Sequence, residues 1–274
     1  MRHRNLSASL LLLVLTTLAC KTFGQNFNAT GGRALGMAGT NILLADAFGL
    51  FNNPGAVEAN SLTFVAAYHT QYIQLGLNDA RLGLIIPTSL LTTGLGVEYF
   101  GDALLNEMLI SSFMADEFGF AKVGVRVNYH QVYVQNYGYK NTVSIDIGGL
   151  FTLSKQVSLA MVFQNLNRAK LNGETDARLS SFLQLGLSYQ PINKFRIDAQ
   201  VEKSIEELIR FRLGFEYKVT KLVSLRSGFS PTNTLAALGM GLSWNTMILD
   251  IAANYQQQLG YSGVISLKVF KLRK

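Results

Sequence analysis

The feature that most constrains the fold of this chain is a two-residue alternation of apolar and polar side chains. In residues 194–203, KFRIDAQVEK, every second residue is apolar, and the residues between them are charged or polar. Residues 121–131 and 208–218 repeat the pattern. Successive side chains of a β-strand point to opposite faces, so the pattern predicts strands with one face in apolar surroundings and the other in a polar space.

A soluble β-sandwich would show the same alternation, but three features favour lipid. The apolar–polar runs are about 9–11 residues long, which is the length of a tilted transmembrane strand. The polar face carries charges that a dry sandwich core would not accept unpaired. Aromatic residues stand at strand ends on the apolar face, as in the interfacial girdles of membrane barrels. The expected girdle residues are Tyr68, Tyr99, Tyr129, Tyr189, Tyr217, Phe229, Trp244 and Tyr255.

The alternation predicts an all-β fold, a transmembrane antiparallel β-barrel of about 14 strands. The expected strands cover residues 61–69, 79–86, 92–100, 104–114, 119–131, 142–153, 157–165, 180–190, 194–203, 208–218, 222–230, 235–244, 247–256 and 261–271. The strand at 104–114 has the least clearly separated faces. Every second connection is short, and the longer ones fall near 131–141 and 165–179. An even strand count places both chain ends in the periplasm, and closure removes the unpaired edges.

The N-terminus predicts export. Residues 1–24 have a basic start, an apolar stretch too short to span a bilayer and small residues before Gln25, which is the pattern of a cleavable signal peptide. The one cysteine, Cys20, lies in a partial lipobox, and we favour its removal with the signal peptide over lipidation. No later apolar run is long enough for a transmembrane helix. An exported apolar chain of alternating strands points to the bacterial outer membrane, with membrane lipid around the barrel.

Charge and motifs exclude several functions. The formal charge of +7 falls to +4 when the basic residues of the signal peptide leave, and this small excess is spread along the chain, which argues against nucleic-acid binding. His69 and His130 have no spacing that forms a metal-ligand pair or a catalytic triad, and we expect ordinary histidines near the barrel rim. We therefore expect no enzyme activity, no metal and no cofactor.

Residues 25–60 lack the alternation and precede the first strand. The stretch GGRALGMAGTNILLADAFGLFNNPGAVEAN, 31–60, is rich in small residues and almost uncharged. It is not a phosphate-binding loop, because it contains no Gly-Lys-Ser/Thr and no strand precedes it. We expect a short helical plug within the barrel, where irregular backbone is shielded from lipid. The expected domains are thus the signal peptide at 1–24, the plug at 25–60 and the barrel at 61–274.

The polar faces of the expected strands carry a set of charges that would line the lumen. In a hairpin of 194–203 and 208–218, Glu202 stands opposite Arg210, and Arg196 opposite Glu216. The signs are balanced, so we favour a stabilising ladder of pairs over a solute-selecting pathway. Inward glycines, such as Gly239, leave volume in the lumen. The lumen charges are Arg126, Asp146, Arg196, Asp198, Glu202, Arg210, Arg212, Glu216, Arg226 and Asp250. The inward glycines are Gly94, Gly96, Gly239 and Gly241.

The plug stretch resembles the N-terminal signature of the FadL/PorV-like outer-membrane proteins. In that family an Arg-x-x-Gly-Met stretch leads through an Asp to Asn-Pro. The matching residues here are Arg33, Gly36, Met37, Gly39, Asp46, Asn53 and Pro54. The resemblance implies a fourteen-stranded barrel with an N-terminal plug.

The same resemblance implies two functions. PorV- and PorQ-type members serve type IX secretion, and FadL-type members pass hydrophobic molecules through the outer membrane. We place a non-catalytic accessory role in surface protein export or assembly first, with other envelope or secretion proteins as partners. FadL-like passive transport of small hydrophobic compounds is the alternative, because the outer loops are short and carry no long apolar excursions.

Overall fold

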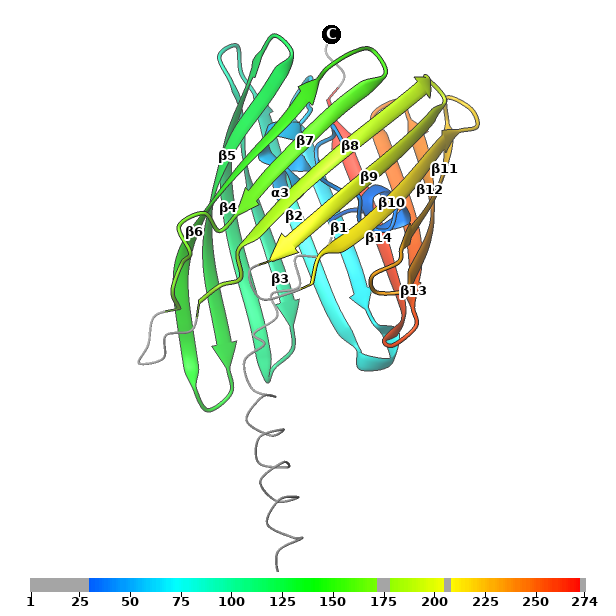
Figure 1. Cartoon of the computed structure of the whole chain (residues 1–274). Coiled ribbons are helices and arrows are strands. Elements are labelled where there is room, and N and C mark those ends of the chain that lie inside the picture. The colour runs from blue at the N-terminus through cyan, green and yellow to red at the C-terminus, as the bar shows by residue number, and fades with distance from the viewer. Residues whose placement is uncertain (1–29, 172–177, 205–207, 272–274) are drawn as a thin grey trace, which may run out of the picture.

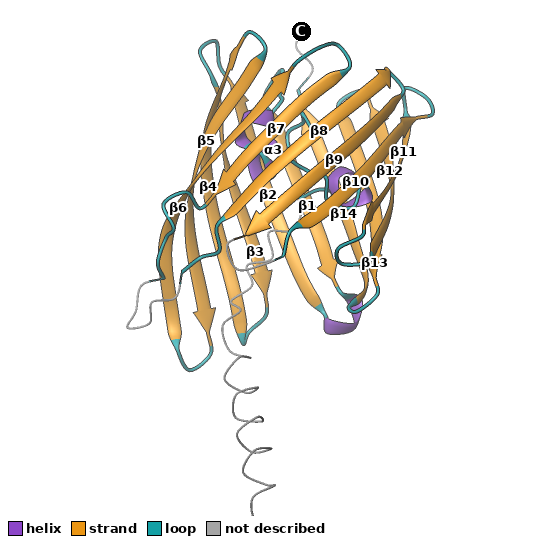
Figure 2. Ribbon diagram, in the orientation of Figure 1, coloured by secondary structure: helices purple, strands orange, loops and turns teal. Residues whose placement is uncertain are grey.

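The computed structural model describes residues 30–171, 178–204 and 208–271. The expected signal peptide and Cys20 lie outside these residues. Fourteen antiparallel strands form one closed barrel (Figures 1 and 2). The strands are β1 (Thr63–Gln71), β2 (Leu77–Pro87), β3 (Thr92–Gly101), β4 (Leu105–Phe118), β5 (Ala121–Val134), β6 (Gly138–Thr152), β7 (Val157–Gln164), β8 (Phe182–Ile192), β9 (Phe195–Ser204), β10 (Arg210–Lys218), β11 (Val223–Ser230), β12 (Leu235–Trp244), β13 (Met247–Gln256) and β14 (Gly260–Phe270).

Each strand pairs with its neighbours in sequence, and β1 closes the ring by pairing with β14. The closing register joins Thr63 to Phe270 and runs to the pair of Thr70 and Gly263. Closure gives the strand backbones hydrogen-bond partners on both sides, which lipid cannot supply. The expected fold is therefore confirmed. We call the end of the barrel at which β1 begins and β14 ends the terminal end, and the opposite end the loop end (Figure 1, where the terminal end is at the top).

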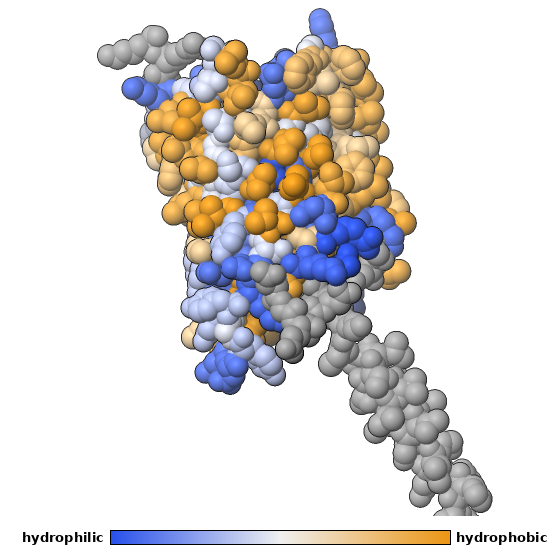
Figure 3. All heavy atoms as spheres, turned by 90° about the vertical axis from the view of Figure 1, so that its left-hand side faces the viewer, coloured by the Kyte–Doolittle hydropathy of each residue, from blue (hydrophilic) through white to orange (hydrophobic). Residues whose placement is uncertain are grey.

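The outer surface is apolar. Large hydrophobic side chains alternate outward along the strands, and hydrophobic residues cover much of one face while hydrophilic residues gather at its lower end (Figure 3). Most expected girdle residues point outward and are exposed, and Trp244 is 78% exposed. Among the described residues, no helix is long and apolar enough to cross a bilayer.

Two connections differ from the expectation. Residues 131–141 are not a loop, because β5 continues to Val134 and β6 begins at Gly138. The rings of Tyr133 and Tyr139 stack across this hairpin with centroids 4.8 Å apart, which favours the extended pairing. The residues left between the expected strands at 104–114 and 119–131 lie in β4, and the chain instead turns around Gly119, whose φ of +62° suits glycine.

The plug lies inside the ring of strands (Figure 2). It consists of two one-turn helices, α2 (Gly32–Gly36) and α3 (Gly49–Asn52), and a short 3-10 turn, η1 (Pro54–Ala56). α2 packs against β12 and β13, and η1 packs against β5 and β6. The plug therefore fills the lumen between opposite walls.

Glycines on the inner face of the wall let the plug approach the strand backbones. Gly148 lies against Asn53 and Pro54 of the plug, and Gly228 lies against Met37 and Ala38. Among the glycines expected to face inward, Gly96 lies against the ring of Phe51 and Gly239 against Gly36. Gly94 and Gly241 also face inward, but they meet side chains of the wall itself, such as Phe113 and Arg226. The missing side chains thus make room for the plug as well as for the inward charges.

A methyl group at Gly228 should therefore unseat the plug. A Cβ there would lie 2.5 Å from the backbone nitrogen of Ala38 and closer still to the carbonyl carbon of Met37. We expect Gly228→Ala to lower the free energy of unfolding by about 1–3 kcal/mol, as overpacking does. Urea titration of the protein in micelles measures this. Gly263→Ala is the matched control, since its Cβ meets no heavy atom closer than 4.0 Å, and an equal loss in both variants would contradict the close packing.

Candidate functional site

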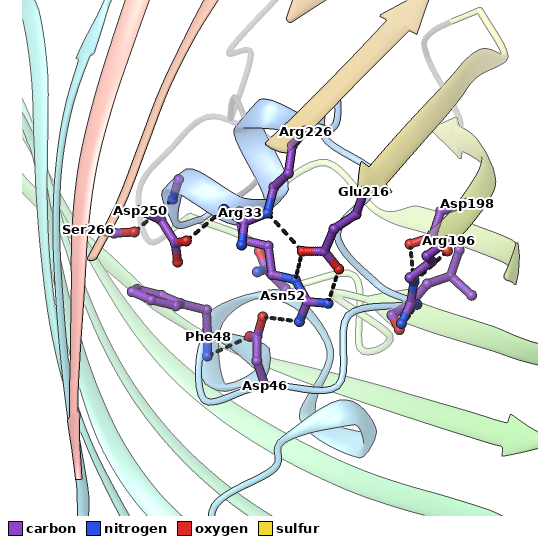
Figure 4. Close-up of polar contacts among 12 residues, drawn as sticks. Arg33, Asp46, Phe48, Asn52, Arg196, Asp198, Glu216, Arg226, Asp250 and Ser266 are labelled. Atoms are coloured by element: carbon purple, nitrogen blue, oxygen red, sulfur yellow. Dashed lines mark hydrogen bonds and ion pairs between the residues drawn. The ribbon is translucent and has the colours of Figure 1, made fainter. Parts of the chain in front are cut away.

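Arg33 of α2 ties the plug to the wall. Its Nε and Nη2 donate to the two carboxylate oxygens of Glu216 on β10, at 3.0 and 2.6 Å. Its Nη1 donates to Oδ2 of Asp46 at 3.2 Å, and Oδ1 of Asp46 accepts from the backbone N–H of Phe48 at 2.9 Å. Arg33 thus lies between a plug carboxylate and a wall carboxylate (Figure 4).

The ion pair continues around the wall. Arg226 on β11 donates from Nε to Glu216 at 2.8 Å and from Nη1 to Asp250 on β13 at 2.6 Å. Burial alone would lower the pKa of Arg33, but the charges of Glu216 and Asp46 outweigh it and hold that pKa above its ordinary value. The guanidinium therefore stays charged. The ion pairs that link α2 to side chains of β10, β11 and β13 are kept as a result.

Asn53 and Pro54 form a second attachment on the opposite side of the barrel. The Asn53 side chain accepts from the backbone N–H of Gly55 at 3.0 Å and donates to the carbonyls of Ile42 and Gly149, at 2.7 and 3.2 Å. Its amide therefore starts η1 and joins the plug to β6. Pro54 lies against the inner face of Gly124 and Gly148.

The other residues of the plug signature serve packing. Gly36 lies against Gly239, and Met37 is fully buried. Gly39, with a φ of +82°, turns the chain after α2. The structure thus brings Arg33 and Asp46 together, and Asn53 and Pro54 together, while the remaining three residues shape the segment that joins the two groups.

An apolar cluster supports α3. Leu50 and Phe51 pack with Val65, Ile85 and Phe113, which point inward from β1, β2 and β4. On this side of the lumen α3 is held to the wall by apolar contacts. The alternation of the sequence is enough to predict that these three wall residues point inward. It does not show which plug residues they contact.

Several wall side chains that hold the plug were missed by the sequence analysis. Gln200 exchanges hydrogen bonds with Asn41, accepting from its N–H at 2.9 Å and donating to its side-chain oxygen at 3.0 Å. Arg81 donates to the hydroxyl of Thr30 and pairs with Glu98 at 2.8 Å. The alternation predicts that such wall residues point inward. The plug sequence has no periodicity, so it does not show which plug residues lie opposite them.

All ten expected lumen charges face inward, and each has an ion-pair partner. Glu202 stands opposite Arg210, as expected, and binds both Arg210 and Arg212. The other pairs of this set are Arg126 with Asp146, Arg196 with Asp198, Glu216 with Arg226, and Arg226 with Asp250.

The expected register of Arg196 and Glu216 is confirmed, but their side chains bind other partners. Arg196 and Glu216 are opposite in register, but Arg196 binds Asp198 on its own strand at 2.8 Å and donates to the carbonyl of Leu43 at 2.6 Å. Glu216 is instead held by the arginine of the plug. Similarly, Arg126 donates to the carbonyl of Leu50 at 2.7 Å. The inward arginines therefore bind the plug backbone as well as wall carboxylates.

Cavities lie on both sides of α2. The cavity at the loop end, which we call the vestibule, has a volume of about 220 Å³ and is bordered by Leu35, Ala38 and Gly39 of the plug. At the terminal end, a cavity of about 250 Å³ is bordered by Arg33 and Ala45, and we call it the inner cavity. One turn of helix and the following turn thus separate the two cavities.

From the sequence we expected no metal site and two ordinary histidines near the barrel rim. No group of three or more histidine, cysteine or acidic residues in the described part of the chain could hold a metal ion. Nδ1 of His69 lies 3.0 Å from Asp79, and Nε2 of His130 lies 2.8 Å from the hydroxyl of Ser144. Both histidines lie near the loop ends of their strands, as expected, and their side chains are buried inside the barrel.

No protein-family profile matches the sequence, and no curated protein matches it. Solved structures match the fold. The toluene transporter TbuX of Ralstonia pickettii has a TM-score of 0.68 at 10% identity, over 89% of this chain and 99% of that one. The P. putida toluene transporter TodX has 0.66 at 10% identity, over 91% and 100%. A Pseudomonas aeruginosa FadL homologue has 0.60 at 12% identity, over 87% and 97%.

These likenesses show a FadL-like outer-membrane barrel fold. TbuX and TodX are described as toluene transporters and CymD as a monoaromatic hydrocarbon channel, and at 10–12% identity the likeness to them shows the fold alone.

Removing the charge of Glu216 should weaken the attachment of the plug. In Glu216→Gln, Arg33 and Arg226 lose their shared carboxylate but keep Asp46 and Asp250. We expect the free energy of unfolding to fall by about 3 kcal/mol, the lower end of the range for a broken buried ion pair. Glu117→Gln is the control, because Glu117 is exposed and pairs with Lys122 at the surface, where such a pair contributes at most about 1 kcal/mol. Equal urea midpoints for the two variants would contradict this attachment.

Proposed function

We propose that this protein lies in the bacterial outer membrane and lets small, largely apolar organic compounds cross it passively. The observation that carries the proposal is the pair of cavities on opposite sides of α2 inside one closed wall. Along β10, Arg212 borders the vestibule and Glu216 borders the inner cavity, and Gly214 between them lies against Met37 and Thr40 of the plug. The fold shared with hydrocarbon transporters and channels supports the same conclusion.

The terminal end faces the periplasm in this proposal. The start of β1, the end of β14 and the short turns all lie at that end, and short turns belong on the periplasmic side of such barrels. Residues 1–24 serve as the signal peptide, residues 25–60 as the plug and residues 61–274 as the barrel. The plug signature then has a division of roles. Asn53 and Pro54 hold the plug to β5 and β6, and Arg33 holds the barrier at α2.

Displacement of α2 would open the route. The α3 half of the plug is held by an apolar cluster with β1, β2 and β4, whereas α2 borders a cavity on each side. Space on both sides allows a short segment to shift without overlapping the wall. The charged pairs of Arg33 oppose that shift and keep the closed state populated.

Uptake and secretion assays distinguish transport from the export role. We expect a deletion strain to take up toluene more slowly while its surface proteins are secreted normally, because the barrel supplies the route. Complementation with the full chain should restore uptake. Normal uptake together with a loss of surface proteins would overturn the proposal in favour of the export role.

A disulfide between α2 and the wall tests the displacement. A Cβ at Gly36 would lie 3.4 Å from Cβ of Ala252, near the lower limit of about 3.5 Å for a disulfide. In proteoliposomes containing the Gly36→Cys/Ala252→Cys variant, we expect oxidation to stop toluene uptake and reduction to restore it. Each single variant serves as a control that oxidation leaves unchanged. Equal uptake in the oxidised and reduced double variant would show that α2 does not move.

A further inference from the structure

Three turns at the terminal end share one backbone arrangement. They lie between β2 and β3, between β6 and β7, and between β10 and β11. In each of them a hydroxyl, from Thr88, Ser154 or Thr220, accepts from the backbone N–H groups two and three residues later, at 3.0–3.3 Å. These hydrogen bonds hold the turn, so the residue that follows the hydroxyl has the same position in all three turns.

The residue at that position differs between the turns. It is Ser89 in the first turn, whereas the other two turns carry Lys155 and Lys221. Because the turn also forms with a serine, its hydrogen bonds do not explain the two lysines. Both lysines are exposed, and neither has an ion-pair partner among the described residues. The lysines therefore serve something other than the turn itself.

The turn between β8 and β9 lies between the two lysine-bearing turns and carries a third lysine, Lys194. Hydrogen bonds connect the three turns. The N–H of Gln190 donates to the carbonyl of Gln156 at 2.7 Å, and the N–H of Lys218 donates to the carbonyl of Lys194 at 2.8 Å. Adjacent turns are about 10 Å apart, because two strand spacings separate them. We call this connected part of the terminal end the basic rim, which consists of residues 152–157, 190–195 and 218–223.

The charge of the basic rim is one-sided. Its residues include four lysines and no aspartate or glutamate. Glu58, which borders the inner cavity with Lys194 and Lys218, offsets one of these charges and leaves three. At the same end of the barrel, the turns between β2 and β3 and between β12 and β13 contain no lysine or arginine, and Lys122 on β5 pairs with Glu117 at 3.2 Å. Positive charge is thus concentrated on one sector.

Apolar side chains accompany the lysines of the basic rim. Leu153, Ile192 and Val219 stand two residues before the three lysines, and all three are exposed. Tyr189 and Tyr217, which are also exposed, lie near the terminal ends of β8 and β10. A lysine at a membrane boundary keeps its stem in apolar surroundings and its amine in the polar layer, and tyrosine is enriched at the same depth. The combination suits the boundary between acyl chains and phosphate groups.

We propose that the basic rim binds anionic phospholipids of the surrounding membrane. Their phosphates lie at Lys155, Lys194 and Lys221, and their acyl chains pack against the three aliphatic side chains and the two tyrosines. The apolar outer surface of the barrel brings lipid to this rim, and the excess of positive charge selects lipids with a net negative charge over zwitterionic ones. This inference concerns the outside of the barrel and goes beyond the proposed transport through its lumen.

Native mass spectrometry of the purified protein in a neutral detergent tests the proposal. Phosphatidylglycerol is the anionic probe, and phosphatidylcholine with the same acyl chains is the zwitterionic control. We expect phosphatidylglycerol to bind at least about tenfold more tightly, because each lysine near an anionic lipid surface contributes about fivefold in affinity.

A double variant locates the binding on the basic rim. In Lys155→Gln/Lys221→Gln, we expect the affinity for phosphatidylglycerol to fall at least about tenfold, while the weak binding of phosphatidylcholine is unchanged. Lys122→Gln/Lys271→Gln is the matched control, because it removes two lysines from the same end of the barrel outside the basic rim. This control should keep the preference for phosphatidylglycerol.

Moving one lysine separates its position from the net charge of the protein. In Lys155→Ser/Ser89→Lys, the two residues exchange places between turns of the same backbone arrangement, and the net charge stays the same. We expect the affinity for phosphatidylglycerol to fall about fivefold. This variant also gives a second test if the double variant does not fold.

Three lipid-binding results would overturn the inference. They are equal binding of the two phospholipids, equal losses in the double variant and its control, and unchanged affinity after the exchange of Lys155 and Ser89. An acidic periplasmic protein is the other partner that suits a basic rim. If such a protein copurifies with the wild type and is lost from the double variant while lipid binding is unchanged, the lysines bind protein and the inference fails. The titration contains no transported compound, so its outcome does not depend on the proposed function.

Discussion

The ion pair between Arg33 and Glu216 joins the N-terminal segment to the barrel wall, and the arrangement of the lumen depends on it. A buried guanidinium is stable only with compensating charge and hydrogen bonds, and here Glu216 and Asp46 provide both. Glu216 in turn orders Arg226, which holds Asp250. One plug residue therefore organises side chains from three strands. The same contacts place α2 between the vestibule and the inner cavity, so the ladder of charges that stabilises the barrel also defines its barrier.

The two halves of the lumen differ in chemistry. Beside β1, β2 and β4, α3 is enclosed by Val65, Ile85 and Phe113 in a dry apolar cluster. On the side of β10 to β14, polar side chains and cavities surround α2. Tight apolar packing resists movement because any displacement opens voids, whereas a hydrated polar region tolerates it. In the proposed route, α3 is therefore the part of the plug that stays attached and α2 is the part that moves.

The alternation of side chains was sufficient to predict the strands, because burial against lipid on one face and a polar lumen on the other impose a period of two. It also predicted the register of Glu202 and Arg210. It could not predict that Arg196 binds Asp198 and the plug. The alternation shows which face of the sheet a side chain is on, but it shows neither its position along the barrel axis nor its rotamer. The extension of the β5–β6 hairpin was missed because residues 132–134 are all apolar and do not alternate, although Tyr133 still pairs with Tyr139 across the hairpin. The vestibule was missed for a related reason, since its lining residues come from distant strands and only closure of the ring brings them together.

The hydrogen bond from the backbone N–H of Gly32 to the hydroxyl of Ser266, 2.8 Å long, connects residues that are 234 positions apart. Contacts between such distant residues form late in folding, because the entropy of closing the intervening chain is lost before the contact stabilises anything. β14, which carries Ser266, is also the strand that completes the ring with β1. The plug therefore acquires its last wall contacts in the same late step that seals the barrel. Until that step the inward arginines and carboxylates are hydrated, so the ordered interior is a product of ring closure.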